Sequence, residues 1–86
     1  MIYKVYVLYS PKHDKLYTGL TTSLIDRMHT HNSDSPDEWT SVYQPWTLVH
    51  MELYNEEDEA LLRETFLDGE EGHQYIREDV LPLFKF

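Results

Sequence analysis

Residues 3–21 read YKVYVLYSPKHDKLYTGLT and hold two short runs that are rich in β-branched and aromatic residues. The first run, Tyr3–Tyr9, ends at Ser10-Pro11, and the second, Lys15–Thr21, follows the turn-forming segment Pro11–Asp14. Runs of this composition are typical of strands, while proline and aspartate are typical of the turn between two strands. The stretch therefore predicts an antiparallel β-hairpin.

The segments after this hairpin predict two or three helices and one further strand. In chain order we expect a helix over 24–31, a polar loop over 32–44, a strand over 46–54, a helix over 55–68 and a short helix near 71–78. Ser23 and Asp26 fit a capping box for the first helix, and Asn55 and Gly69 fit the start and the C-cap of the second. The order predicts an α/β (α+β) fold: a small three-stranded, mainly antiparallel sheet flanked by two to three helices, in one domain over 1–86.

The first expected helix carries two polar residues beside an apolar arc. At about 100° per residue, Leu24, Ile25 and Met28 fall on one face of this helix. Arg27 and His31 are four residues apart, so both lie along one edge of that face and can point at the same object. An arginine and a histidine in this arrangement suit the binding of an anion.

The second expected helix carries a glutamate among apolar residues. Glu64 falls in the same arc as Ala60, Leu61 and Leu67. A carboxylate in such surroundings is costly to bury unless it is paired, protonated or bound to a metal ion. Leu62 and Phe66 lie on the other side of the helix, which predicts that this helix is covered on two faces.

The composition limits the classes of function. The 86 residues hold 16 acids against 7 bases, for a net charge of −9, and residues 51–86 contribute −8 of it. The chain has no cysteine, which excludes disulfides, thiolate catalysis and zinc-thiolate sites. Four histidines show no metal-ligand spacing: His13, His29, His50 and His73. The apolar run at the N-terminus is too short to span a membrane, and we expect a cytoplasmic protein with no membrane partner.

The chain resembles the GIY-YIG nucleases, in particular small single-domain bacterial members similar to the N-terminal domain of excinuclease C. Each motif is short, but their order and spacing together are specific. The matching segments are Val5-Tyr6-Val7 for the first signature, Tyr17-Thr18-Gly19 for the second, residues 24–32 for the arginine helix, Glu59–Glu64 for the glutamate segment and Gly72–Ile76 for the third helix.

This resemblance implies metal-dependent hydrolysis of a phosphodiester in nucleic acid. Tyr17 or Tyr6 would deprotonate or position the attacking water, although a phenol, with a pKa near 10, needs a nearby cation to act as a base at neutral pH. Arg27 would neutralise the charge that builds up on the phosphate, and His31 would donate to the phosphate or assist the base. Glu64 would hold one divalent ion, Mg²⁺ or Mn²⁺.

The acidic charge keeps a second function open. Small relatives carry lysines or arginines in two stretches that here read Asp68-Gly69-Glu70-Glu71 and Thr40-Ser41-Val42-Tyr43. The alternative is a catalytically weak or inactive GIY-YIG-like domain whose acidic surface binds a protein partner. Since few bases are present, we expect the isolated domain to bind nucleic acid weakly, with a Kd above roughly 10 µM at physiological salt. A protein partner would then supply the missing basic surface.

Overall fold

The computed structural model describes residues 1–32 and 39–86; part of the expected polar loop, residues 33–38, lies outside the described residues. The main elements are β1 (Tyr3–Ser10), β2 (Lys15–Thr21), α1 (Leu24–His31), β3 (Thr47–Tyr54), α2 (Glu57–Leu67) and α3 (Glu70–Tyr75). Three short helical segments complete the described chain: η1 (Trp39–Tyr43), the π-helical η2 (Ile76–Val80) and η3 (Leu81–Leu83). None of these helices is long and apolar enough to cross a membrane.

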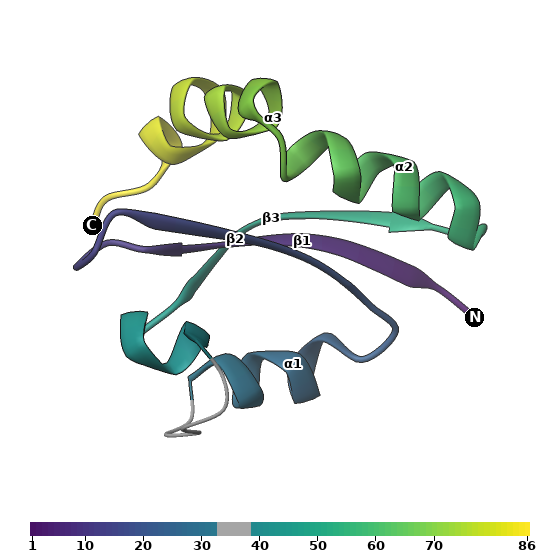
Figure 1. Ribbon diagram of the computed structural model, residues 1–86, viewed down its shortest axis with the longest axis horizontal. Coiled ribbons are helices and arrows are strands. Elements are labelled where there is room, and N and C mark those ends of the chain that lie inside the picture. Colours follow the sequence, from purple (N-terminus) through teal and green to yellow (C-terminus); the bar gives the residue numbers. More distant parts are fainter. Residues whose placement is uncertain (33–38) are drawn as a thin grey trace.

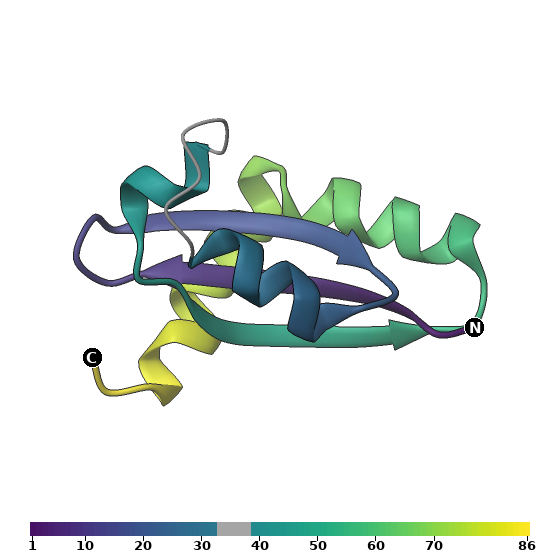
Figure 2. The ribbon, with the colours of Figure 1, turned by 90° about the horizontal axis from the view of Figure 1, so that it is seen from below.

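The predicted fold is confirmed. The sheet has three strands in the order β2-β1-β3, and β1 runs antiparallel to both neighbours. Helices α2 and α3 cover one face of the sheet, whereas α1 and η1 lie on the other (Figure 1). Seen from below, α1 crosses the sheet while α2 runs behind it along β2 (Figure 2).

The central strand β1 supplies both halves of the core. Because successive side chains of a strand point to opposite faces, Val5 and Val7 pack under α2 and α3, and Tyr6 and Leu8 face α1. All four side chains are fully buried, as a strand covered on both faces requires. Tyr6, the tyrosine of the first signature, is therefore a core residue on the α1 face.

Three helix ends differ from the expected caps. The Ser23 hydroxyl donates to the Asp26 carboxylate at 2.7 Å and makes no hydrogen bond to the backbone, so the predicted capping box is not formed. Helix α2 begins at Glu57, and its N-cap is Glu56 and not Asn55. Gly69 has a φ of −90° and serves as the N-cap of α3, because the chain turns directly from α2 into α3.

The prediction that α2 is covered on two faces is wrong. Leu62 is 74% exposed and Phe66 39% exposed, and of this helix only Ala60 and Leu67 are buried. Helix α3 packs closely on the end of α2 and not on its outer face. Gly72 makes this approach feasible, because a Cβ there would collide with the backbone of Leu67.

Candidate active site

A buried hydrogen-bonded chain links the first signature tyrosine to α1 and η1. The Tyr6 hydroxyl lies 3.0 Å from Nε2 of His31, and Nδ1 of His31 lies 3.1 Å from Oγ1 of Thr40. Thr40 is held in turn by Trp46, whose Nε1 donates to the Thr40 carbonyl at 2.6 Å. His31 is fully buried, and protein groups contact both of its ring nitrogens. Of the two roles expected for His31, donating to the phosphate or assisting the base, this geometry favours the second, in which His31 fixes Tyr6.

Arg27 connects Tyr6 to the second signature tyrosine. Its half-buried guanidinium lies beside the two phenols, and its interaction with the Tyr6 hydroxyl is the largest cause that raises the pKa of Arg27, with Tyr17 as a further cause. Burial raises the pKa of Tyr6 to about 12, although the neighbouring Arg27 guanidinium opposes this shift. Tyr6 therefore keeps its proton at neutral pH, and Arg27 stays charged beside it.

Tyr17 is the phenol that solvent can reach. It lies on the edge strand β2, is half-buried, and its ring centroid is 4.4 Å from that of His31 and 6.1 Å from that of Tyr6. The structure also explains the glycine of the second signature. Gly19 on β2 is the register partner of Tyr6 on β1. A Cβ at Gly19 would collide with the Tyr6 phenol, so only glycine leaves room for it there.

The structure thus brings four of the five predicted site residues together: Tyr6, Tyr17, Arg27 and His31. Glu64 lies on α2, in the layer on the other face of the sheet. Among the described residues, no hydrogen bond or ion pair joins Glu64 to the other four. Its place relative to them follows from the geometry of α2.

Glu64 faces the same edge of the sheet as Tyr17. On α2 the buried stripe is Ala60 and Leu67, and at 100° per residue Arg63 and Glu64 flank it by about 50° on opposite sides. Arg63 reaches Glu52 on β3 with bonds of 2.8 and 3.0 Å. Since β2 and β3 are the two edges of the sheet, Glu64 is directed toward the β2 edge, and Tyr17 and Arg27 reach this edge from the other face.

The surroundings of Glu64 fit a single divalent cation. Burial, and after it the negative charge of Asp68, raises the pKa of Glu64. In the described ranges no basic side chain pairs with this carboxylate and no group of three or more metal-binding side chains exists. A lone carboxylate is nevertheless a sufficient protein ligand for Mg²⁺, which retains several waters and takes substrate oxygens as further ligands. A cation bound to Glu64 would offset the negative charge of Asp68 and stabilise the ionised form of the partly buried carboxylate.

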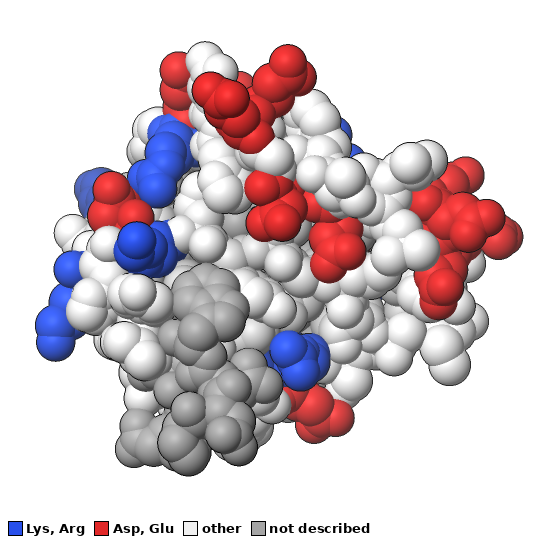
Figure 3. Space-filling model, viewed as in Figure 1, with Lys and Arg blue, Asp and Glu red and all other residues white. Residues whose placement is uncertain are grey.

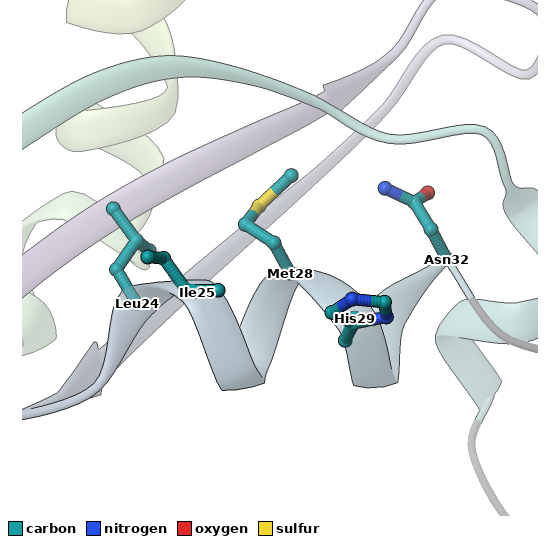
Figure 4. Close-up of a pocket in the computed structure, with 5 residues that line it drawn as sticks. All are labelled: Leu24, Ile25, Met28, His29 and Asn32. Atoms are coloured by element: carbon teal, nitrogen blue, oxygen red, sulfur yellow. The ribbon is translucent and has the colours of Figure 1, made fainter.

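The opposite flank of α1 is apolar. Leu24, Met28 and Asn32 point from α1 toward the strands, and together with Ile25 and His29 they line an open pocket of about 430 Å³ (Figure 4). The Asn32 side chain accepts a 2.7 Å bond from the backbone N–H of Trp46, which places this flank toward β3. Helix α1 therefore directs Arg27 to the β2 edge and an apolar pocket to the β3 edge.

Charges are distributed unevenly over the surface. In Figure 3 acidic side chains gather over the α2–α3 layer and where α2 begins, and most basic side chains in view lie toward the end with the hairpin turn. The first turns of α2 and α3 are acidic. The β2 edge thus lies between an acidic layer and the more basic hairpin.

A family model for the GIY-YIG catalytic domain matches residues 2–75. The chain belongs to the GIY-YIG family. Members of this nuclease family generally use a divalent metal ion. The chain is 38% identical over 53 residues to a UPF0213 protein of Staphylococcus haemolyticus, a match that covers 62% of this chain and 65% of the relative. A UPF0213 protein of Staphylococcus aureus is 36% identical over 70 residues, which are 81% of this chain and 79% of that one.

The structural comparison agrees with this GIY-YIG assignment. The solution NMR structure of a UPF0213 protein from Bacillus halodurans matches with a TM-score of 0.58 at 26% identity, over 96% of this chain and 90% of that one. The sheet order, the hairpin and the placement of helices on both faces are therefore features of the family fold.

Sequence reasoning missed Thr40, which lies in the polar loop and has no motif around it. Arg27 can only donate and lies beside the Tyr6 oxygen, so the Tyr6 proton is left for Nε2 of His31. We therefore assign the His31 ring proton to Nδ1, from which it donates to Thr40.

Replacing Thr40 tests this assignment. We expect Thr40→Val to leave the buried Nδ1–H without an acceptor and to lower the free energy of unfolding by about 1–2 kcal/mol, measured by urea denaturation. Thr40→Ser, which keeps the hydroxyl, should stay close to wild type. Nitrogen-15 NMR of His31 should show the Nδ1–H tautomer in wild type and in the serine variant. An Nε2–H tautomer in wild type would contradict the assignment.

Proposed function

We propose that this GIY-YIG domain is a metal-dependent endonuclease that hydrolyses phosphodiesters in nucleic acid. The observation that supports it best is the arrangement at the β2 edge, where one guanidinium lies beside two signature phenols and a buried imidazole backs the first of them. Arginine matches the geometry of a phosphate, and a positioned phenol can orient and deprotonate water. Few structural roles require all four groups at one edge.

The geometry divides the roles of the two tyrosines. Tyr6 is fully buried and keeps its proton, so it cannot contact the attacking water. Tyr17, on the edge strand, is the phenol that can contact and orient the attacking water. It acts as the base in its phenolate form, which becomes a neutral phenol when it takes the proton of the water, and the charge of the neighbouring Arg27 stabilises that phenolate.

Arg27 also has a direct role at the phosphate. Its planar fork has five N–H donors, of which the phenols use only a part. The remaining donors stabilise the negative charge on the non-bridging oxygens as the water oxygen bonds to phosphorus and the P–O bond to the leaving group breaks. His31 and Thr40 act as positioning residues, because they hold Tyr6 and contact no substrate.

Glu64 is the residue that would hold the divalent cation, Mg²⁺ or Mn²⁺. When bound, such an ion supplies positive charge beside the phosphate and the leaving oxygen. Glu64 itself must be ionised to bind it, and its raised pKa means that protons compete with the ion as the pH falls.

The acidic α2–α3 surface favours a second candidate, a weak or inactive domain that binds a protein partner. Leu62 and Phe66 are exposed within this surface, so it offers apolar contacts as well as charge. A partner with a basic surface would fit it and would also add phosphate contacts that the isolated domain lacks. The two candidates predict different outcomes in a cleavage assay.

A plasmid-nicking assay with a matched pair of variants separates these candidates. We expect wild type to relax supercoiled plasmid or cut branched DNA in the presence of Mg²⁺ or Mn²⁺ and to lose this activity in EDTA. Glu64→Gln should reduce the rate at least about 100-fold, because the cation loses its protein ligand. Glu57→Gln removes the same charge from the exposed first turn of α2 and should leave the rate unchanged. Equal rates for the two variants would contradict the role of Glu64, and no cleavage by wild type would favour the second candidate.

A further inference from the structure

The basic side chains of this acidic chain divide into paired and unpaired groups. Arg63 forms an ion pair with Glu52, and Arg77 forms one with Asp14 at 2.7 Å. Within residues 1–32 and 39–86, no ion pair engages Arg27 or the four lysines: Lys4, Lys12, Lys15 and Lys85. Lys85 lies on the C-terminal segment. Lys4, on β1, pairs with Thr21 at the end of β2 away from the turn and donates to the Thr22 carbonyl at 3.4 Å. Within the described ranges, Arg27, Lys15 and Lys12 are the cations without an ion pair near Tyr17 and the turn end of β2.

Lys15 lies on the same face of β2 as the catalytic phenol. Side chains two residues apart on a strand share a face, so Lys15 and Tyr17 both point toward α1 and η1. Ser10, the register partner of Lys15, confirms this side, because its hydroxyl donates to the Tyr43 carbonyl in η1 at 2.6 Å. Nζ of Lys15 lies 5.5 Å from the centre of the Tyr43 ring.

The neighbouring acid, Asp14, forms its ion pair with Arg77 and not with Lys15. The Asp14 carboxylate accepts hydrogen bonds from Tyr9 at 2.8 Å and from Arg77 at 2.7 Å, and these two bonds hold its pKa below the usual value. Arg77 belongs to η2, which follows α3, so its bond holds the Asp14 carboxylate toward the face of the sheet that α2 and α3 cover. The Lys15 ammonium lies over the Tyr43 ring, an arrangement that restricts a long side chain while leaving its ammonium accessible to an anion.

We propose that Lys15, held over Tyr43, binds the phosphate next to the one that Arg27 and Tyr17 contact, so that the β2 edge accepts a short single-stranded segment of nucleic acid. This inference rests on the proposed function. Residues 15 and 17 are about 6.8 Å apart along the strand, a spacing that neighbouring phosphates of an extended single strand can match. Lys12, in the turn between β1 and β2, supplies a cation for one further phosphate beyond the one at Lys15.

The charges on either side explain why a single strand is favoured over a duplex. Three cations can neutralise only about three phosphates, far fewer than a duplex presents over the same footprint. The second strand of a duplex at this edge would approach the acidic layer of α2, where Glu64 and Asp68 lie four residues apart. A single strand is flexible enough to follow β2 and to keep its phosphates on the basic side.

The test measures binding with cleavage suppressed. Fluorescence anisotropy in EDTA follows a labelled 12-nucleotide thymidine strand, and the same strand in a duplex, between about 20 and 200 mM salt. We expect wild type to bind the single strand more tightly than the duplex at every salt concentration. Lys15→Ala should weaken single-strand binding about three- to tenfold at low salt and reduce the slope of log K against log salt by about 0.7. Lys85→Ala gives the same net charge and should behave as wild type.

Each remaining outcome is informative. Equal affinities and slopes for Lys15→Ala and Lys85→Ala, or tighter binding of the duplex, would overturn the proposal about Lys15 even if wild type cleaves plasmid. A specific effect of Lys15→Ala in a protein that does not cleave would support the subsite and refute the nuclease function. Absence of single-strand binding at the lowest salt would overturn the proposal about Lys15, while the nicking assay with Mg²⁺ or Mn²⁺ decides the nuclease function separately.

Discussion

Replacing Arg27 with alanine should reduce the cleavage rate by about 10²–10³-fold, the loss expected when one preorganised donor to a developing negative charge is removed. The effect should be this large because one side chain does two things. Arg27 places its charge beside the hydroxyls of Tyr6 and Tyr17, and it has N–H donors for the phosphate. The nicking rate of supercoiled plasmid with Mg²⁺ or Mn²⁺ measures the loss.

Arg27→Lys is the matched control for charge. Lysine keeps the positive charge but cannot contact two phenols and a phosphate with a planar fork. We expect it to restore only a small part of the rate. The melting temperature of both variants should stay within a few degrees of wild type, since Arg27 is only half-buried. An alanine variant that cleaves within threefold of wild type would remove Arg27 from the mechanism.

The second large effect concerns acid stability and the Glu52 carboxylate. Burial acts to raise the pKa of Glu52, but hydrogen bonds from Arg63, Tyr54 and His50 outweigh it and lower this pKa from 4.5 to about 2. The bonds are short, with Tyr54 and His50 both at 2.6 Å. Because the carboxylate is only partly exposed, the lowered pKa corresponds to about 2–3 kcal/mol of stability at neutral pH.

The pH range follows from the direction of this shift. The pKa is lower in the folded state, so the contribution is fully present above about pH 5 and is lost as the pH falls through the folded pKa near 2. We therefore expect Glu52→Gln to lower the free energy of unfolding by about 2–3 kcal/mol at pH 7 and to approach wild type near pH 2. Urea denaturation from pH 7 to pH 2 measures this, with Glu57→Gln as an exposed control. Parallel curves for wild type and Glu52→Gln over the whole range would contradict it.

The strands and the first helix could be predicted from sequence because their signals are local. The bounds of β2 and α1 agree with the expectation, and β1 and β3 differ from it by one residue at one end. In each case a run of β-branched and aromatic residues, or an apolar arc, decides the element within its own length. The signature residues Tyr6 and Gly19 face each other for the same reason, since the hairpin register follows from the turn.

The features that sequence reasoning missed depend on distant contacts. Gly69 caps α3 instead of ending α2 in a left-handed conformation, because α3 packs at once against the end of α2. Leu62 and Phe66 stay exposed, although their spacing suggested a second covered face. The role of Thr40 arises from packing between η1 and α1, which no local pattern encodes. The burial of His31 between Tyr6 and Thr40 arises from the same packing.

The central claim is that Glu64, from one layer, and Tyr17 and Arg27, from the other, form one metal-dependent site at the β2 edge. Paramagnetic broadening by small amounts of Mn²⁺ in amide NMR spectra tests it directly. We predict that the signals of residues 17–19 in β2 and of residues 64–68 in α2 weaken first, while those of residues 51–53 on the opposite edge persist. Glu64→Gln should abolish this pattern and Glu57→Gln should preserve it. Broadening centred on the acidic residues 56–59, with Tyr17 and Gly19 unaffected, would contradict the account.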